Sequence, residues 1–250
     1  MIGRAVLSRK LVSYGFAAGV FRTRTIPVLA AVFAILAIGF DSGPAAAQQD
    51  RRQGAPGKFD FYVLALSWSP SYCAAAAEQG RKPPQLQCAG RPYSFVVHGL
   101  WPQYERGFPE YCQVPAPRLN RNIVSRMLDQ MPAPGLIFQQ WDKHGTCSGL
   151  SPHAYFENVR RARAVVRIPD EFFQLEKPRM VSPAAVKEAF LKANPGLSAN
   201  GIGVVCDNRR LREVRICMTR AFNFRNCAEI TRRSCRRDQI LMPPMRSSGI

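Results

Sequence analysis

Acidic residues are scarce in this sequence of 250 residues. It holds 17 Asp and Glu against 35 Lys and Arg, which gives a formal charge of +18. An excess of positive charge attracts polyanions, so RNA, DNA, acidic glycans and anionic lipid surfaces are all candidate partners. Charge alone leaves open a second interpretation, in which the basic residues serve only solubility.

The sequence also lacks an apolar run long enough to span a bilayer, which takes about 20 residues. Its longest uncharged apolar run extends only from Ile26 to Phe40. Arg22 and Arg24 precede this run, and small residues follow it in the stretch PAAAQQD. This order is typical of a secretory signal peptide, so we predict that residues 1–47 are removed on export to the periplasm or the medium. A membrane anchor is the alternative, but the run is short for one. We expect no stable membrane insertion after removal of the signal.

Removal of residues 1–47 takes away five basic residues and Asp41, which leaves 30 basic and 16 acidic residues and a formal charge of +14. Residues 206–250 hold 11 Lys and Arg against four acidic residues, so half of that charge lies near the C-terminus. The pattern fits a polyanion-binding face and a merely solvated arginine surface equally well.

No Cys-x-x-Cys pair occurs, and the spacings of the cysteines fit no common zinc finger. We therefore expect no metal and no other cofactor. All eight cysteines follow the predicted cleavage point, and an even number in an exported chain indicates disulfides. Eight cysteines allow 105 pairings, so the residues alone do not give the connectivity.

The rest of the chain predicts a single α+β domain, and we expect a monomer. Residues 48–58 are polar and contain Gly and Pro, which indicates a flexible linker; the domain follows over residues 59–242, with a C-terminal tail at 243–250. Ser151-Pro152 and Ser182-Pro183 each place a capping hydroxyl before a proline and so predict the starts of two helices. The pattern predicts strands at 59–68, 201–207 and 211–218, and a strand in SFVVHGLW, residues 94–101, that is ended by Gly99. It predicts helices at 152–166 and 183–194.

The chain contains no Gly-x-Ser-x-Gly, and its cysteines are committed to bridges, so serine and cysteine hydrolases are disfavoured. It has only three histidines. His98 comes directly after the strand-forming residues SFVV, and His144 lies in FQQWDKHGTC, residues 138–147. His153 lies in the first turn of a predicted helix and is expected to be exposed. If 138–147 is helical, residues four apart share a face, which puts Gln140 beside His144 and Gln139 beside Lys143.

Two histidines and a lysine suit the cleavage of a ribose phosphodiester. One group must take the proton of the 2′-hydroxyl, a second must protonate the departing 5′-oxygen, and a cation must stabilise the charge on the phosphorane. Histidine fills either proton-transfer role near neutral pH, and lysine supplies the charge. DNA lacks the 2′-hydroxyl and should not be cleaved. A lone histidine near tryptophan is more often a packed residue than a catalyst, and that alternative remains for His98.

HGLWP, residues 98–102, and WDKHGTC, residues 141–147, resemble the two active-site segments of the ribonuclease T2 family. LSWSPSYC at 66–73 resembles the first strand of that family, and LREVRIC at 211–217 its C-terminal strand. The resemblance covers about residues 59–235. It implies one disulfide-bridged α+β domain with an antiparallel sheet and flanking helices. It also implies an exported, metal-independent endoribonuclease that acts on single-stranded RNA and leaves 2′,3′-cyclic phosphate ends.

The same resemblance implies roles for single residues. His98 would be the general acid, His144 the general base, and Lys143 would stabilise the phosphorane. Trp101, and more weakly Tyr104, would offer an aromatic face to a base; packing in the core is the alternative for Trp101. The disulfides implied by the family are Cys73–Cys88, Cys112–Cys147, Cys206–Cys235 and Cys217–Cys227.

The chain departs from the family at the start of the second segment. The family has His-Glu-Trp there, and this chain has Gln139 and Gln140 before Trp141. We expect Gln140 to belong to the catalytic set and Gln139 to bind the substrate. Both can hydrogen-bond a phosphate or an imidazole, but neither supplies a charge. Without the carboxylate, we expect the pKa of His144 to fall and a weaker enzyme whose activity persists to lower pH.

Two other interpretations stay open. In one, the fold binds RNA or another polyanion through its arginine-rich C-terminal region and has impaired or no catalysis. In the other, a basic exported protein acts at membranes or cell walls, and the histidines do not matter for its function.

Overall fold

The main sheet of the protein is antiparallel and has four strands. The computed structural model describes residues 54–173 and 175–245, so the predicted signal peptide lies outside the described residues. The strands are β1 (Phe61–Trp68), β2 (Phe95–Gln103), β4 (Ile202–Cys206) and β5 (Leu211–Met218), in the order β2-β1-β5-β4. A second, two-stranded sheet pairs β3 (Arg179–Val181) with β6 (Ile240–Met242). The four predicted strands are therefore present.

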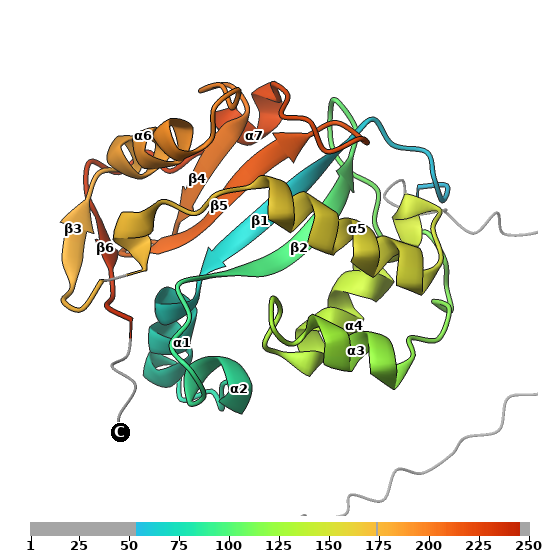
Figure 1. Cartoon of the computed structure of the whole chain (residues 1–250), viewed down its shortest axis with the longest axis horizontal. Coiled ribbons are helices and arrows are strands. Elements are labelled where there is room, and N and C mark those ends of the chain that lie inside the picture. Colours follow the sequence, from blue (N-terminus) through green and yellow to red (C-terminus); the bar gives the residue numbers. More distant parts are fainter. Residues whose placement is uncertain (1–53, 174, 246–250) are drawn as a thin grey trace, which may run out of the picture. The chain divides into compact units, whose positions relative to one another are not determined.

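Helices flank the main sheet, as the predicted α+β class requires (Figure 1). In the caps of the two predicted helices, the Ser151 and Ser182 hydroxyl oxygens accept hydrogen bonds from the backbone N–H groups of Ala154 and Ala185. The α-helices are α1 (Ser69–Glu78), α2 (Gln85–Cys88), α3 (Arg121–Met127), α4 (Pro134–Lys143), α5 (Pro152–Val165), α6 (Pro183–Ala193) and α7 (Ala228–Arg232), and the short 3₁₀ helices are η1 (Gly145–Ser148) and η2 (Asp170–Phe172).

The main hydrophobic core lies between the sheet and helices α5 and α6, which cross one face of it in Figure 1. Its fully buried side chains include Leu64, Leu66, Trp68, Leu100, Tyr155, Phe190, Ile202 and Ile216. A second, smaller apolar cluster on the opposite face is made of Phe61, Val63, Cys217, Cys227 and Ile230, with Trp101 packed against it. Polar side chains can therefore occupy the rest of that opposite face without disturbing the core.

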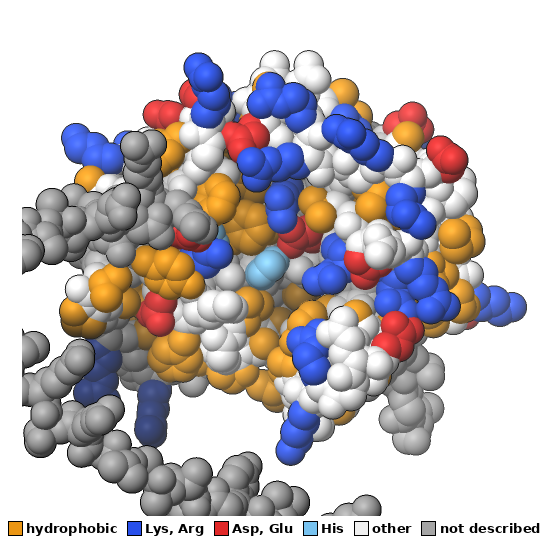
Figure 2. Space-filling view, turned by 180° about the vertical axis from the view of Figure 1, so that it is seen from behind, with side chains coloured by type: hydrophobic (Ala, Val, Ile, Leu, Met, Phe, Trp, Pro, Cys, Tyr) orange, Lys and Arg blue, Asp and Glu red, His pale blue; other side chains and the backbone are white. Residues whose placement is uncertain are grey.

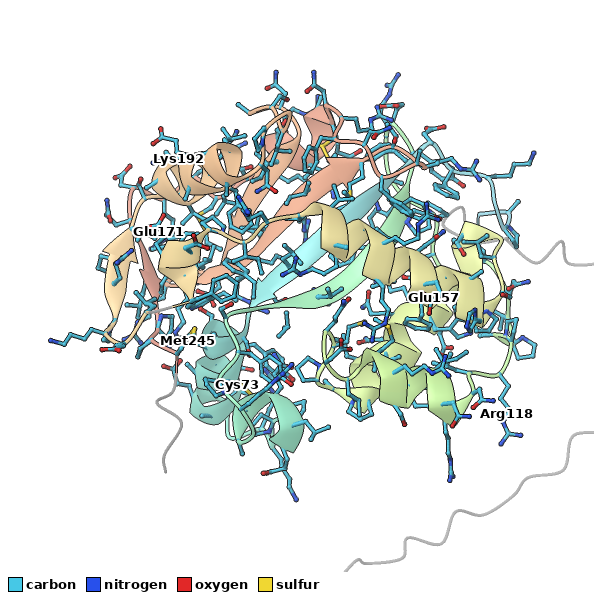
Figure 3. The ribbon with its side chains drawn as sticks, viewed as in Figure 1. Cys73, Arg118, Glu157, Glu171, Lys192 and Met245 are labelled. Atoms are coloured by element: carbon cyan, nitrogen blue, oxygen red, sulfur yellow. A yellow bond between two sulfur atoms is a disulfide. The ribbon has the colours of Figure 1, made fainter. Side chains whose placement is uncertain are left out.

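Four disulfides join Cys73 to Cys88, Cys112 to Cys147, Cys206 to Cys235 and Cys217 to Cys227. These are the pairs that the family resemblance implies. The first links α1, where Figure 3 labels Cys73, to α2. The second ties η1 to the loop that precedes α3.

Several element boundaries differ from those predicted. Gly99 does not end the second strand, which continues to Gln103. The helix around residues 138–147 begins earlier, at Pro134, and ends at Lys143, so His144 caps it. In the predicted linker, the Gly57 N–H donates to the Cys147 carbonyl, so residues 54–58 are held by the domain. The domain boundary predicted at 242 coincides with the end of β6, although the Met245 N–H still donates to the carbonyl of Leu175.

Within the described ranges, no helix combines the length and the apolar character that a membrane crossing requires.

Candidate active site

A β-bulge in β2 places His98. Leu66 pairs with Val97 and Ala65 pairs with Gly99, which makes His98 the extra residue of the bulge. Side chains alternate along a strand, so strict alternation from the buried Leu100 would turn His98 into the main core. The bulge instead directs its imidazole to the opposite face of the sheet, where it meets β5.

On that face a carboxylate holds His98. The Nδ1 atom of His98 lies 2.8 Å from Oε2 of Glu213, and the other carboxylate oxygen of Glu213 accepts a 2.7 Å hydrogen bond from Nε of Arg215. The Glu213 side chain is 7% exposed, whereas that of His98 is 34% exposed. Burial alone would raise the pKa of Glu213, but the hydrogen bond and charge of His98 and the charge of Arg215 hold it below its ordinary value. An ionised Glu213 accepts a hydrogen bond from the Nδ1–H of His98, which leaves Nε2 of His98 for a substrate.

Helix α4 places the second histidine at its C-terminal end. The backbone N–H of His144 donates to the Gln140 carbonyl, and a Cβ on the next residue, Gly145, would lie 2.4 Å from the Trp141 ring. Glycine is therefore required immediately after His144. The imidazole itself is buried, and its Nδ1 has no hydrogen-bond partner among the described residues. Burial, followed by the positive charges of Lys143 and His98, lowers the pKa of His144 to about 3.

A carboxylate holds Lys143 as well. Nζ of Lys143 lies 3.1 Å from Oε2 of Glu110, whose side chain is largely buried, while one third of the lysine side chain stays exposed. The Tyr111 N–H donates to the Lys143 carbonyl and so fixes the chain beside Glu110. The ammonium is thus fixed in orientation, and its positive charge acts on His144, whose pKa it helps to lower.

The indole of Trp101 contacts both histidines. Its ring centroid is 5.2 Å from that of His98 and 5.3 Å from that of His144. Its Nε1 donates a 2.6 Å hydrogen bond to Oε1 of Gln140, and the Arg215 guanidinium stacks over the ring at 5.1 Å. A Cβ at Gly99 would lie 2.1 Å from that same amide oxygen, so glycine is needed for this contact.

The side chain of Gln140 therefore contacts Trp101. The sequence predicts that Gln140 lies beside His144, and the backbone hydrogen bond between them agrees, but the amide oxygen of Gln140 is engaged by the indole. The pKa of His144 moves in the expected direction, and burial is its largest cause. Gln139 and Lys143 lie four residues apart in α4, as predicted; Lys143 is paired with Glu110, while Gln139 is exposed and lines a cleft.

That cleft has a volume of about 880 Å³ and opens beside His98. Its lining includes Gln139 of α4, Glu213 and Arg215 of β5 and the cationic residues Arg81 and Lys82. Figure 2, which views the face opposite α5 and α6, shows a histidine in a hollow with Lys and Arg side chains around it. His144 and Trp101 are not among the residues that line this cleft.

The remaining sequence candidates lie elsewhere. Tyr104 packs, partly buried, against the main core and does not line the cleft. Base stacking by Tyr104 or Trp101 stays a prediction. His153 is exposed in the first turn of α5. Over residues 54–173 and 175–245, no three His, Cys, Asp or Glu side chains are grouped so that they could hold a metal ion.

Sequence reasoning missed Glu213, Arg215 and Glu110. Glu213 is 115 residues from His98 along the chain, so no local motif joins them. A weak signal exists in LREVRIC, where Glu213 and Arg215 alternate with apolar residues in a strand. Alternation places two opposite charges on one face of the sheet, which in a largely buried strand indicates a paired site.

The arrangement brings together two imidazoles in opposite environments and an oriented ammonium, and an open cleft lies beside one of the imidazoles, that of His98. A neutral imidazole can accept a proton, and an imidazole next to an ionised carboxylate can donate one. The ammonium of Lys143 can stabilise a developing negative charge.

Known protein families, sequences and solved structures include several that are similar to this chain. A model of the Ribonuclease T2 family matches residues 59–227. A ribonuclease of Aeromonas hydrophila is 34% identical over 175 residues, which are 67% of this chain and 75% of that protein. The structure of an RNase-related protein from Calystegia sepium has a TM-score of 0.60 at 19% identity and covers 76% of this chain and 98% of its own. A variant of RNase MC1 in complex with 5′-UMP has a TM-score of 0.53 at 23% identity, over 66% and 91% of the two chains. These two structures share the fold described above.

Proposed function

This chain belongs to the ribonuclease T2 family and is an endoribonuclease, and we propose that it cleaves single-stranded RNA by attack of the 2′-hydroxyl, without a metal ion. The products are a 2′,3′-cyclic phosphate and a new 5′-hydroxyl. The observation that carries the proposal is that His98 and His144 flank one indole in opposite electrostatic surroundings.

The surroundings of each histidine support its role. His144 is buried and its pKa is lowered to about 3, so its imidazole is neutral over most of the pH range and serves as the general base for the 2′-hydroxyl. The 2′-oxygen then attacks phosphorus, and the bond from phosphorus to the 5′-oxygen breaks. His98, oriented through Nδ1 by Glu213, gives its Nε2 proton to that 5′-oxygen.

Lys143 supplies the positive charge for the phosphorane. Its ammonium is held by Glu110 next to His144, which is where the attacking oxygen must lie. Gln140 acts through Trp101, because its amide oxygen fixes the indole that contacts both histidines. No step in this sequence needs a Lewis acid, since the two imidazoles and the ammonium fill all three roles.

We place the enzyme outside the cytoplasm, in the periplasm or the medium. The support is twofold, because residues 1–47 have the pattern of a signal peptide and four disulfides persist only in an oxidising compartment. Expression of the full-length chain, followed by fractionation and N-terminal sequencing of the exported product, tests this. An intact N-terminus on cytoplasmic protein would contradict it.

The activity test uses the mature chain from Gln48 with its disulfides formed. It is incubated with single-stranded RNA and with the matching DNA in EDTA between pH 4 and pH 8, beside a His98→Ala/His144→Ala variant. We expect cyclic phosphate ends on RNA, intact DNA and an inactive variant.

One observation favours a second function, the binding of RNA without cleavage. Position 140 carries no charge, so the base has no carboxylate partner there. A folded protein that retards RNA in a gel and leaves it uncut at every pH would replace the enzyme with this binding protein.

A further inference from the structure

The cleft lies on one side of the two-histidine site. His98 lines it and His144 does not. The proposed general acid protonates the leaving 5′-oxygen, so the nucleotide that departs, on the 3′ side of the cleaved bond, must lie on the His98 side. The cleft is therefore on the path of the RNA chain downstream of the scissile phosphate. Its volume of about 880 Å³ lies near the top of the range for small-molecule sites.

Part of the lining of this cleft is cationic. Arg81 and Lys82 are exposed, and neither forms an ion pair with any residue in the described ranges. Arg81 donates only to the neutral amide of Gln79. The other cations of the cleft differ, since Arg215 is paired with Glu213 and Arg212 lies 3.8 Å from Asp207. The uncompensated positive charge of the lining is thus concentrated at Arg81 and Lys82.

The segment that carries these two residues is fixed against the rest of the domain. The Arg81 N–H donates to the Ala76 carbonyl of α1, and Pro83 and Pro84 follow directly. The disulfide between Cys73 and Cys88 closes the loop on both sides of it. A cationic loop that is ordered before the ligand arrives loses little conformational entropy on binding.

We propose that Arg81 and Lys82 form a subsite for the phosphate on the 3′ side of the leaving nucleotide. The proposal rests on the function proposed above, because the direction of the RNA chain follows from His98 as the general acid. The subsite makes a polymer a better substrate than a dinucleotide. Its ligand is a phosphodiester or a phosphomonoester, recognised by charge and not by the base.

The experiment compares three substrates at low salt: UpA, UpA with a 3′-terminal phosphate, and UpA with a 5′-terminal phosphate. We expect the 3′-phosphate to raise kcat/KM by about threefold to tenfold, as two exposed ion pairs permit, and the 5′-phosphate to have little effect. Added salt should remove the gain. In an Arg81→Gln/Lys82→Gln variant the gain should disappear, so that the ratio of kcat/KM with and without the 3′-phosphate falls to about one.

The matched control is Lys187→Gln/Lys192→Gln on α6, which removes the same charge outside the cleft; Figure 3 labels Lys192 there. This variant should keep the gain from the 3′-phosphate. An equal gain from either terminal phosphate, or a gain that survives the loss of Arg81 and Lys82, would overturn the subsite.

A binding measurement separates this proposal from the proposed function. The 2′-deoxy dinucleotide lacks the nucleophile and cannot be cleaved, so its affinity reports the subsite even if the protein cuts no RNA. We expect a 3′-phosphate on the deoxy dinucleotide to lower Kd for the wild type and not for the Arg81→Gln/Lys82→Gln variant. Equal affinities with and without that phosphate would refute the subsite, whereas failure to cleave UpA and RNA would refute the enzyme.

Discussion

His98 and His144 contact the same indole from two regions of the molecule that differ in burial and in the partners they offer to an imidazole. His98 stands on a sheet, is one third exposed and contacts an ionised carboxylate. His144 ends a helix, is buried, and has no hydrogen-bond partner for Nδ1 among the described residues. Two residues of one type are thereby prepared for two tasks, because burial favours a neutral imidazole and a carboxylate favours a charged one.

Removal of either histidine should have the largest effect on activity. His98→Ala and His144→Ala should each lower kcat/KM on RNA by about 10²- to 10⁴-fold, the usual contribution of a general acid or base. A uridine 3′-phosphate ester with a nitrophenol leaving group distinguishes them. That leaving group needs no proton, so His98→Ala should recover most of its loss on this ester and His144→Ala should not. If both variants recover equally, the two roles are assigned wrongly.

The burial of His144 should also appear in the pH dependence of stability. Its pKa is about 3 in the folded protein and near 6.5 when unfolded. Between these values the unfolded chain binds more protons, so the free energy of unfolding falls as pH falls from 6.5 to 3, by up to roughly 5 kcal/mol. Glu213, whose pKa is lowered, adds to the loss in acid. Urea unfolding at pH 7, 5 and 4 measures the change.

In a His144→Asn variant, the free energy of unfolding should depend less on pH, while the contribution of Glu213 to that dependence should remain. The matched control is His153→Asn, because His153 is exposed on α5 and should leave the curve unchanged. Equal flattening by both variants would mean that His144 is not the buried titrating group.

The surroundings of His98 are tested by Glu213→Gln, which keeps the size of the side chain and removes its charge. The imidazolium of His98 then loses a hydrogen bond to a charged partner, so kcat on RNA should fall by about 10- to 100-fold with little change in KM. The activated nitrophenyl ester should be cleaved at nearly the wild-type rate, which a general loss of structure would not allow.

Asp129→Asn is the control, since it removes a carboxylate from an arginine pair outside the cleft. It should leave both substrates unaffected. An equal loss on RNA and on the activated ester in Glu213→Gln would show that Glu213 supports the fold and not His98.

The sequence could give the two histidines but not their surroundings. His98, Lys143 and His144 lie in short motifs that can be recognised in the sequence. The starts of α5 and α6 can be recognised as well, because Ser151 and Ser182 cap them locally. The bulge that turns His98 outward depends on the register between β1 and β2, which no short segment encodes. The contact with Glu213 joins residues 115 apart, so it exists only once β5 pairs with β1.

The smallest effect on activity is expected when His144, like His98, is given a carboxylate nearby. In Gln140→Glu the new side chain can still accept from Nε1 of Trp101, and it adds a negative charge near His144. That charge should raise the pKa of His144, so the acidic limb of the pH profile should move to higher pH while the rate near neutrality rises a few-fold. Gln139→Glu places the same charge on the exposed side of α4 and should shift the limb less. If Gln140→Glu neither gains rate nor moves the limb, the glutamine does not weaken the enzyme, and burial alone sets the behaviour of His144.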